Sequence, residues 1–238
     1  MIQIKNLTKT YKKNTVIRNL NLEIQEGVIT ALVGPNGSGK TTLLKCILGL
    51  TFPSKESKVL LAGLEYLKQN ELYEIGYMPQ TPLFPQNLKV KEILEILETL
   101  EKKNPVFKER IKDELEIEKF ENKYFGELSG GMKQKVNILQ CFSSEKKFYI
   151  IDEPTASLDP HISFYLKNLL KERKTMGSSI LFTSHIMSEV DEIADRVVVM
   201  VEGKLILHEA PIEILAKSKA SNMEEALRSF WMKEGKHA

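Results

Sequence analysis

Short apolar runs alternate with longer amphipathic runs along much of the chain. Residues 28–33 form a continuous apolar run rich in β-branched residues, which predicts a buried strand. Further strand-like runs occupy residues 2–7, 20–24, 148–151, 180–183 and 196–201. Continuous apolar strands interleaved with helical patterns favour a parallel sheet that is covered on both faces. The pattern therefore predicts an α/β fold with a mainly parallel core sheet.

The pattern of apolar and charged residues changes in residues 82–127, where leucine and isoleucine recur at near-helical spacing among lysine and glutamate. A second amphipathic pattern follows in residues 107–120. These patterns predict a small helical subdomain of residues 82–127. It is inserted into one core domain that is formed by residues 1–81 and 128–238.

A glycine-rich segment separates the strand at residues 28–33 from a helical run. The segment reads Gly-Pro-Asn-Gly-Ser-Gly, and Lys40 and Thr41 open the helical run. Glycines let backbone N–H groups converge, and a helix start adds unpaired N–H groups and a positive dipole end, so the segment favours an anion. The spacing fits the motif G-x-x-x-x-G-K-[ST], in which Lys40 reaches the outer phosphates of a nucleotide and Thr41 offers an oxygen to Mg²⁺.

A purely structural turn would explain neither the lysine nor the threonine. The predicted nucleotide-contacting residues of this loop are Gly34, Pro35, Asn36, Gly37, Ser38, Gly39, Lys40, Thr41 and Thr42.

Two acidic residues follow the apolar run at residues 148–151. Neighbouring side chains on a strand point to opposite faces, so Asp152 and Glu153 need not share a task. The carboxyl ends of parallel strands face the ligand crevice of an α/β sheet. We expect Asp152 to hold Mg²⁺ through its water shell and Glu153 to orient and polarise an attacking water near a γ-phosphate.

A second glycine pair stands at a second helix start, where Ser129 is followed by Gly130 and Gly131. Serine at such a position is most often an N-cap, and this interpretation stays open for Ser129. An N-cap does not require two glycines, however, and their freedom lets backbone N–H groups approach a bound anion. The chain therefore carries two predicted anion cradles.

Composition and charge narrow the classes of partner. The 34 basic and 32 acidic residues give a net charge of +2, which is too balanced to argue for nucleic acid. Cys46 and Cys141 lie in apolar helical runs and are predicted to be buried core thiols. No run approaches the ~18 apolar residues that span a bilayer, and the N-terminus shows no signal-type apolar region. We expect any link to a membrane to come through a partner.

The motifs occur in the order that is found in the ATP-binding cassette (ABC) ATPases, which the chain resembles over nearly its whole length. They are the phosphate loop, Gln80 in "GYMPQ", the signature "LSGGMKQ", the acidic strand "IIDEP", "SLD" ending at Asp159, and His185 in "TSHIMSE". The resemblance implies a P-loop NTPase fold with an N-terminal antiparallel β region and a helical subdomain. It also implies head-to-tail dimers, in which one subunit's loop and the other's Ser-Gly-Gly enclose the same ATP.

The resemblance assigns further roles. Tyr11 corresponds to the aromatic residue that stacks on adenine, although an ordinary strand tyrosine remains the alternative. Gln80 corresponds to the residue that contacts Mg²⁺ and the attacking water, and Asp159 to the acid that links the two sites of a dimer. An Asp-Pro pair also suits a turn and helix start. His185 is expected to contact a γ-phosphate oxygen. The predicted catalytic set is Lys40, Gln80, Glu153 and His185; the predicted metal ligands are Thr41, Gln80 and Asp152.

Departures from the family pattern are modest. Met132, Lys133 and Lys135 replace residues that are more frequent after the signature glycines. The segment at residues 143–147 lacks the usual proline, which we expect to alter a surface turn only. No catalytic group is missing, so active ATP hydrolysis is expected.

The resemblance implies a motor subunit that works as a homodimer or with a paired nucleotide-binding domain. It would dock on an integral membrane permease subunit at the cytoplasmic face of the inner (plasma) membrane. Leu83, Phe84, Leu88 and Val90 form either part of the docking groove or the core of the helical subdomain. Met132 after the signature glycines and the segment at residues 184–205 resemble exporter-type cassettes of the multidrug, sodium and copper group.

The strings "QKVNI", "SHIMSEV" and "NMEEALRSF" more narrowly resemble the ATPase of the nitrous-oxide-reductase maturation system, which acts in copper-site assembly. A multidrug or other ABC-2-type exporter ATPase is the main alternative. A soluble ABC protein acting on ribosomes or DNA and a nucleotide-dependent scaffold without turnover are the others.

Overall fold

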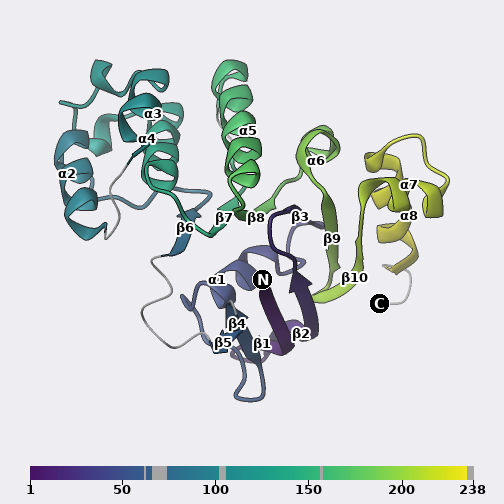
Figure 1. Ribbon diagram of the computed structural model, residues 1–238. Coiled ribbons are helices and arrows are strands. Elements are labelled where there is room, and N and C mark those ends of the chain that lie inside the picture. Colours follow the sequence, from purple (N-terminus) through teal and green to yellow (C-terminus); the bar gives the residue numbers. More distant parts are fainter. Residues whose placement is uncertain (62, 66–73, 102–105, 156–157, 235–238) are drawn as a thin grey trace. The chain divides into compact units, whose positions relative to one another are not determined.

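The computed structural model describes residues 1–61, 63–65, 74–101, 106–155 and 158–234 (Figure 1). Contacts within the chain divide it into two compact units. The first unit comprises Met1–Leu72 and Ser179–Ala238, and the second comprises Tyr73–Ser178. The helical subdomain predicted at residues 82–127 would be a part of the second unit, and its boundaries stay a prediction.

An antiparallel sheet near the N-terminus forms one part of the first unit. Its strands, in the order β2-β1-β4-β5, are β2 (Asn14–Ile24), β1 (Ile2–Tyr11), β4 (Lys58–Leu61) and β5 (Leu64–Glu65). Ile2, Ile4 and Leu7 of β1 are buried, whereas Lys5 and Asn6 are exposed. One face of the strand is thus apolar and the other polar, as is typical of antiparallel sheets. This sheet confirms the predicted N-terminal antiparallel region.

The first unit also contains four strands in the order β10-β9-β3-β8. They are β10 (Lys204–Glu209), β9 (Arg196–Val201), β3 (Ile29–Val33) and β8 (Ser179–Thr183). Strand β3 pairs in parallel with β8 and β9, and β10 pairs antiparallel with β9. Every residue of β3 and β8 is buried, which is why both read as continuous apolar runs. The predicted α/β class is confirmed.

In the described part of the first unit, helices accompany these strands (Figure 1). They are α1 (Lys40–Ile47), α6 (Met187–Ile193), α7 (Pro211–Ser218) and α8 (Met223–Glu234). Helix α8 contacts α6, α7 and β9, and it buries Met223, Ala226 and Leu227 completely. The C-terminal helix is therefore part of the core of this unit.

The second unit joins a parallel strand pair to several helices. Its elements are β6 (Ile75–Met78), β7 (Phe148–Asp152), α2 (Val90–Leu100), α3 (Lys108–Glu114), α4 (Gly130–Phe142), α5 (Pro160–Thr175) and the short 3₁₀ turns η2 (Ile117–Lys119) and η3 (Phe125–Glu127). Helix α4 contacts β6, α2 and α3 and is the central element among them. Arg173 of α5 is fully buried, donates to the carbonyl of Phe142 and lies over the ring of Phe107.

The amphipathic pattern at residues 107–120 covers α3 and the 3₁₀ turn η2, which are separated where Glu116 adopts a left-handed φ of 53°. One local prediction is wrong. The segment at residues 143–147 is more than a surface turn, since Ser144 and Lys146 are buried. The Lys146 ammonium pairs with Glu101 at 2.9 Å, which explains how a lysine is buried there.

Candidate functional site

The glycine loop lies between β3 and α1, as the motif requires. Gly39 precedes the first residue of α1 with a φ of 102°, and the carbonyl of Gly39 accepts from Leu43 N at 2.8 Å. Ser38 N donates to the carbonyl of Pro35 at 3.1 Å, which closes a turn within the loop. The backbone of the loop therefore continues directly into the first turn of α1.

Strand β9 and the turn after it support this loop. A Cβ added to Gly34 would lie 2.2 Å from the carbonyl oxygen of Met200, so only glycine fits there. Gly203, in the turn between β9 and β10, donates its N–H to the carbonyl of Ser38 at 3.0 Å. Because the loop is held at these two points, its shape is set by a strand far away in sequence.

The side chains around the loop suit an anion. The Lys40 ammonium donates to the carbonyls of Gly34 and Pro35, at 2.7 and 3.2 Å, and so is held along the loop. The first turn of α1, which carries Thr41 and Thr42, has no acidic side chain. Ser38 Oγ is buried and makes no hydrogen bond within the described part of the chain. A phosphate oxygen is the kind of partner that such groups accept.

Two other predicted residues lie in the same unit. Tyr11 ends β1 with 44% of its surface exposed, and the Lys9 ammonium lies 4.7 Å from the centre of its ring. His185 is exposed and follows β8. Ser184 and Ile186 flank His185, and the Ser184 hydroxyl accepts from Ile186 N at 3.0 Å. The same hydroxyl donates to Glu189 Oε2 at 3.0 Å. Ser184 and the buried Glu189 thus hold the short segment that presents His185.

The acidic pair lies in the second unit, at the end of β7. Asp152 is the last residue of the strand and is buried. Its charge, together with burial as the larger cause, raises the pKa of Tyr77 on the paired strand to about 12. Glu153 is half-buried and has a φ of 49°, a left-handed conformation that costs most residues about 1–2 kcal/mol. Such strain is concentrated at functional sites.

Within the second unit, Gln80 and Glu153 meet. Gln80 Nε2 donates to Glu153 Oε2 at 2.6 Å, a short and charge-assisted bond. The backbone on which Gln80 stands is in turn held by α4, because Gln134 donates to the Gln80 carbonyl and Asn137 to the Pro79 carbonyl. Gln134 and Asn137 were not among the predicted residues. Their position three residues apart on the signature helix was the only sequence signal, and it indicates a shared helix face and nothing more.

The two predicted dimer-contacting side chains both act as helix N-caps. Ser129 Oγ accepts from Met132 N at 3.3 Å at the start of α4, and Asp159 accepts from Ile162 N at 2.9 Å at the start of α5. The capping interpretation therefore holds for both residues. Ser129, Gly130 and Asp159 are also exposed, so they remain accessible to a partner. Ser157 of the "SLD" motif lies outside the described residues.

The four apolar residues after Gln80 are not equivalent. Val90 is fully buried in α2, and Phe84 makes an edge-on contact with the ring of Phe125 at 5.3 Å. The Leu88 carbonyl accepts from Phe125 N. Leu83, by contrast, is 86% exposed. Core packing thus accounts for Val90 and Phe84, and only Leu83 is a clearly exposed apolar side chain.

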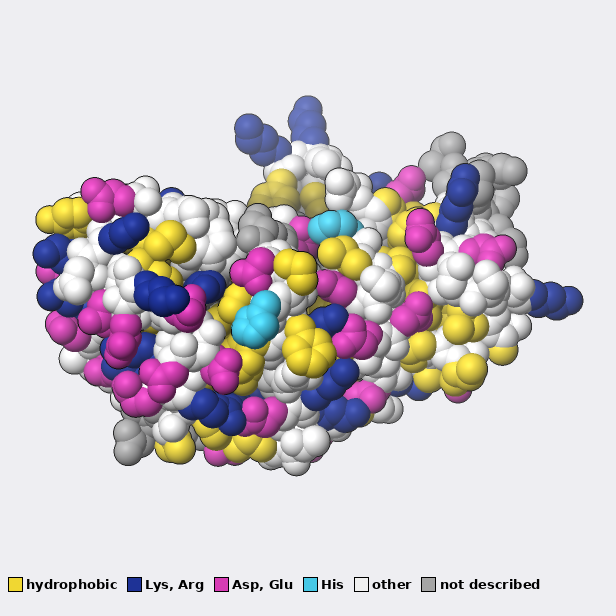
Figure 2. All heavy atoms as spheres, turned by 90° about the horizontal axis from the view of Figure 1, so that it is seen from above, with side chains coloured by type: hydrophobic (Ala, Val, Ile, Leu, Met, Phe, Trp, Pro, Cys, Tyr) yellow, Lys and Arg dark blue, Asp and Glu magenta, His cyan; other side chains and the backbone are white. Residues whose placement is uncertain are grey.

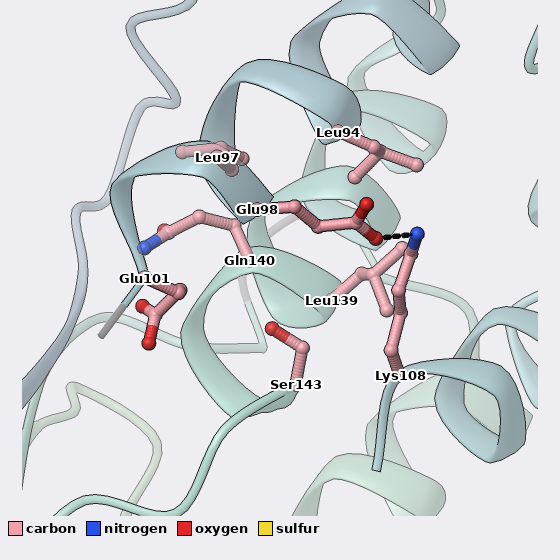
Figure 3. Close-up of a pocket in the computed structure, with 8 residues that line it drawn as sticks. All are labelled: Leu94, Leu97, Glu98, Glu101, Lys108, Leu139, Gln140 and Ser143. Carbon is pink, nitrogen blue, oxygen red and sulfur yellow. Dashed lines mark hydrogen bonds and ion pairs between the residues drawn. The ribbon is translucent and has the colours of Figure 1, made fainter. Parts of the chain in front are cut away.

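A small pocket between α2, α4 and the start of α3 is too small for a nucleotide (Figure 3). Its cavity volume is about 30 Å³, room for a water molecule or two. Leu94, Leu97 and Leu139 supply apolar lining, and Glu98 pairs with Lys108 at its edge. The pocket belongs to the packing of the helices.

The cysteines are buried free thiols, as predicted. Burial raises the pKa of Cys46 to about 11 and raises that of Cys141 further above its ordinary value. The face of the molecule seen in Figure 2 carries lysine and arginine next to aspartate and glutamate, in keeping with the balanced charge. Among the described residues, no helix is both long and apolar enough to cross a bilayer.

Oxygen donors for Mg²⁺ are present in both units. Thr41 offers an exposed hydroxyl in the first turn of α1, and Asp152 offers a carboxylate at the end of β7. Hydroxyl and carboxylate oxygens are the ligand types that Mg²⁺ prefers. The donor set therefore fits the ion in its chemistry.

Comparison with known proteins identifies the family. The model of the family described as "ABC transporter" matches residues 17–156. The chain belongs to the ABC transporter family. It is 38% identical over 216 residues to the bacitracin transport ATP-binding protein BcrA of Enterococcus faecalis, an alignment that covers 87% of this chain and 68% of that protein. It is 32% identical over 207 residues to the lantibiotic transport ATP-binding protein SrtF of Streptococcus pyogenes, covering 87% and 90%.

Solved structures support the same family. The ATP-binding subunit of an ABC transporter superposes with a TM-score of 0.88 at 26% identity, covering 96% of this chain and 98% of that one. A dimeric ATP-binding cassette in a post-hydrolysis state, bound to ADP and Pi, gives a TM-score of 0.76 at 28% identity, covering 88% and 98%. The chain is thus an ABC ATPase. The two relatives from Enterococcus and Streptococcus are named for bacitracin and lantibiotic transport, and they give no support to the predicted copper-assembly role.

Proposed function

We propose that this ABC ATPase is the ATP-hydrolysing motor subunit of a transporter, and that two copies, or one copy and a paired domain, close head-to-tail on Mg·ATP. The observation that carries the proposal is the complete phosphate loop, with its tethered Lys40 and the buried hydroxyl of Ser38, which has no hydrogen-bond partner among the described residues. The post-hydrolysis dimer among the structural relatives supports hydrolysis and pairing.

The chemistry is mainly positioning and electrostatic stabilisation. The loop amides and the Lys40 ammonium bind the β- and γ-phosphates and neutralise charge as the γ-phosphoryl group departs. Glu153 holds and polarises the attacking water, and His185 contacts a γ-phosphate oxygen. Gln80 donates a hydrogen bond to Glu153 and so would contact the same water. Thr41, Gln80 and Asp152, the last through water, are the residues that would hold Mg²⁺, and the ion would supply neutralisation of phosphate charge.

The second half of each site comes from another copy. In this arrangement Ser129 and the glycines after it bind the γ-phosphate of a nucleotide that sits in the partner's loop, and Asp159 links the two sites. The exposure of Ser129 and Asp159 supports these roles. Tyr11 stacks on adenine, and the 44% exposure of its surface supports this role.

The membrane partner is a separate permease subunit, which would place the chain at the cytoplasmic face of the plasma membrane. The transport ATP-binding relatives and the lack of a spanning helix among the described residues agree with such a division of labour. Exposed Leu83, close behind Gln80, is suited to contact that subunit. Export of a peptide antibiotic is the narrower role that the relatives favour over copper-site assembly.

Phosphate release from the purified chain with Mg·ATP tests the proposal. Wild-type protein hydrolyses ATP, and Glu153→Gln binds ATP but turns over at least ~100-fold more slowly, because the carboxylate that orients the water is gone. Fluorescent-nucleotide titration gives the affinity, and a phosphate assay gives the rate. Turnover of Glu153→Gln at the wild-type rate would exclude Glu153 as the water-orienting group, and an inactive wild type would exclude the motor.

A further inference from the structure

A chain of hydrogen bonds runs from helix α4 to the carboxylate of Glu153. Asn137 Nδ2 donates to the Pro79 carbonyl at 2.9 Å, and Gln134 Nε2 donates to the Gln80 carbonyl at 2.8 Å. Gln80 Nε2 then donates to Glu153 Oε2 at 2.6 Å. All five residues belong to the second unit. The geometry of the chain is therefore set within one compact body.

The two amides on α4 are buried, and each is fixed by the other. Gln134 is 4% exposed and Asn137 is 1% exposed, and Asn137 Nδ2 also donates to Gln134 Oε1 at 3.0 Å. A buried amide costs free energy unless its hydrogen bonds are made, about 1–3 kcal/mol for each unsatisfied group. Apolar side chains would fill this buried helix face without the cost of unsatisfied polar groups. The amides therefore serve the two carbonyls that they hold.

The two ends of the chain are functional groups of the proposed site. Helix α4 begins directly after Ser129, whose residue type and position belong to the signature, and α4 contacts β6. The loop that carries Gln80 leaves the end of β6, and Glu153 follows the paired strand β7. A displacement of α4 relative to β6 thus moves the carbonyls of Pro79 and Gln80, and with them the amide that binds Glu153.

We propose that Gln134 and Asn137 are positioning residues that couple the signature helix to Glu153 through the backbone of Pro79 and Gln80. The inference rests on the proposed function, in which Glu153 orients the attacking water. Engagement of Ser129 by nucleotide would shift α4, and the two amides carry that shift to the Gln80 side chain. The position of the Glu153 carboxylate therefore follows the position of helix α4.

The test removes one donor at a time and separates turnover from binding. Gln134→Met keeps the length of the side chain but donates no hydrogen bond, and Asn137→Ala removes the second donor with a smaller side chain. Each variant lowers kcat on the order of tenfold, because the water-orienting group is displaced. The KM and affinity for ATP stay within about twofold, because the phosphate loop keeps its own contacts. A merely structural role would lower the midpoint of thermal unfolding and leave kcat unchanged, which would overturn the proposal.

A matched control and a double variant sharpen the result. Gln140→Met makes the same change on the same helix, but Gln140 lines the small pocket of Figure 3, so kcat stays at the wild-type value. In a Gln80→Ala background, Gln134→Met adds little further loss, because it acts through Gln80. Losses that multiply independently would contradict the coupling. If Gln134→Met does not fold, the Asn137→Ala arm decides on the same criteria.

Glu153→Gln, measured in the same series, distinguishes a failure of the proposed function from a failure of the proposed coupling. Wild-type turnover in that variant would overturn the proposed function. A slow Glu153→Gln beside Gln134→Met and Asn137→Ala variants with wild-type kcat would overturn the coupling alone.

Discussion

At the scale of single residues, the side chains with proposed chemical roles are held by polar neighbours. Lys40 is tethered by two loop carbonyls, and Glu153 by the Gln80 amide. His185 is flanked by Ser184, whose hydroxyl bonds the backbone on the far side of the histidine. Such second contacts fix a reactive group before substrate arrives, which lowers the cost of reaching the transition state.

Ser184 provides a prediction at this scale. Ser184→Ala removes the bonds to Ile186 N and Glu189, so the His185 segment loosens and kcat for ATP hydrolysis falls about fivefold, the value of one hydrogen bond of ~1 kcal/mol. Ser184→Thr keeps the hydroxyl and most of the rate. Steady-state phosphate release beside thermal unfolding measures both effects.

Ser144→Ala is the matched control, because it deletes a buried hydroxyl for which the described structure shows no partner. It should leave kcat unchanged. Equal rates for Ser184→Ala and wild type would show that His185 needs no such support.

At the scale of elements, a turn distant in sequence shapes the phosphate loop. Gly203 has a φ of 76°, and an added Cβ would lie 2.1 Å from the carbonyl oxygen of Val16. Its N–H binds the Ser38 carbonyl, and its own carbonyl accepts from Arg18 N. The turn therefore joins β2 to the loop.

Gly203→Ala should raise the KM for ATP and lower the free energy of unfolding. Gly27→Ala is the control, because Gly27 has a similar φ of 67° but no atom within 4 Å of an added Cβ. Both substitutions introduce left-handed strain of about 1 kcal/mol, and Gly203→Ala adds at least ~1 kcal/mol from the clash. Urea unfolding and ATP titration of KM measure the difference. Equal effects in both variants would contradict a link between the turn and the loop.

Elements with a strong, local signal were predictable from sequence. Strands β3, β7, β8 and β9 are continuous apolar runs, and their bounds agree with the structure to within a residue. Strands β4, β6 and β10 were missed because they are short or carry few buried residues, and because β6 contains Gly76. Their pairing is set by neighbours that are distant in sequence, which no local pattern reports.

The site divides in the same way. Motif residues such as Lys40 and Glu153 were found because their chemistry requires a fixed residue type at a fixed spacing. The Gln80–Glu153 bond and the amides of Gln134 and Asn137 depend on which helix face meets which loop. Burial of Lys146 was missed for the same reason, since its partner Glu101 directly follows α2 and is distant in sequence.

At the scale of the whole molecule, the proposed ATP site depends on pairing between two copies of the chain. Within one chain, Lys40 and the phosphate loop belong to the first unit, and Ser129 belongs to the second. The proposed head-to-tail dimer completes each site with a loop from one copy and a signature from the other. Substitutions at the two places should therefore complement each other in a mixture.

Complementation is the most direct measurement of this claim. Lys40→Ala and Ser129→Arg are each inactive alone, because every site in either dimer lacks one half. In an equimolar mixture, each mixed dimer holds one site built from the intact Lys40 and the intact Ser129. About a quarter of all sites are then whole, and phosphate release rises well above the mean of the two variants measured separately. A mixture no more active than that mean would contradict a site shared between two copies.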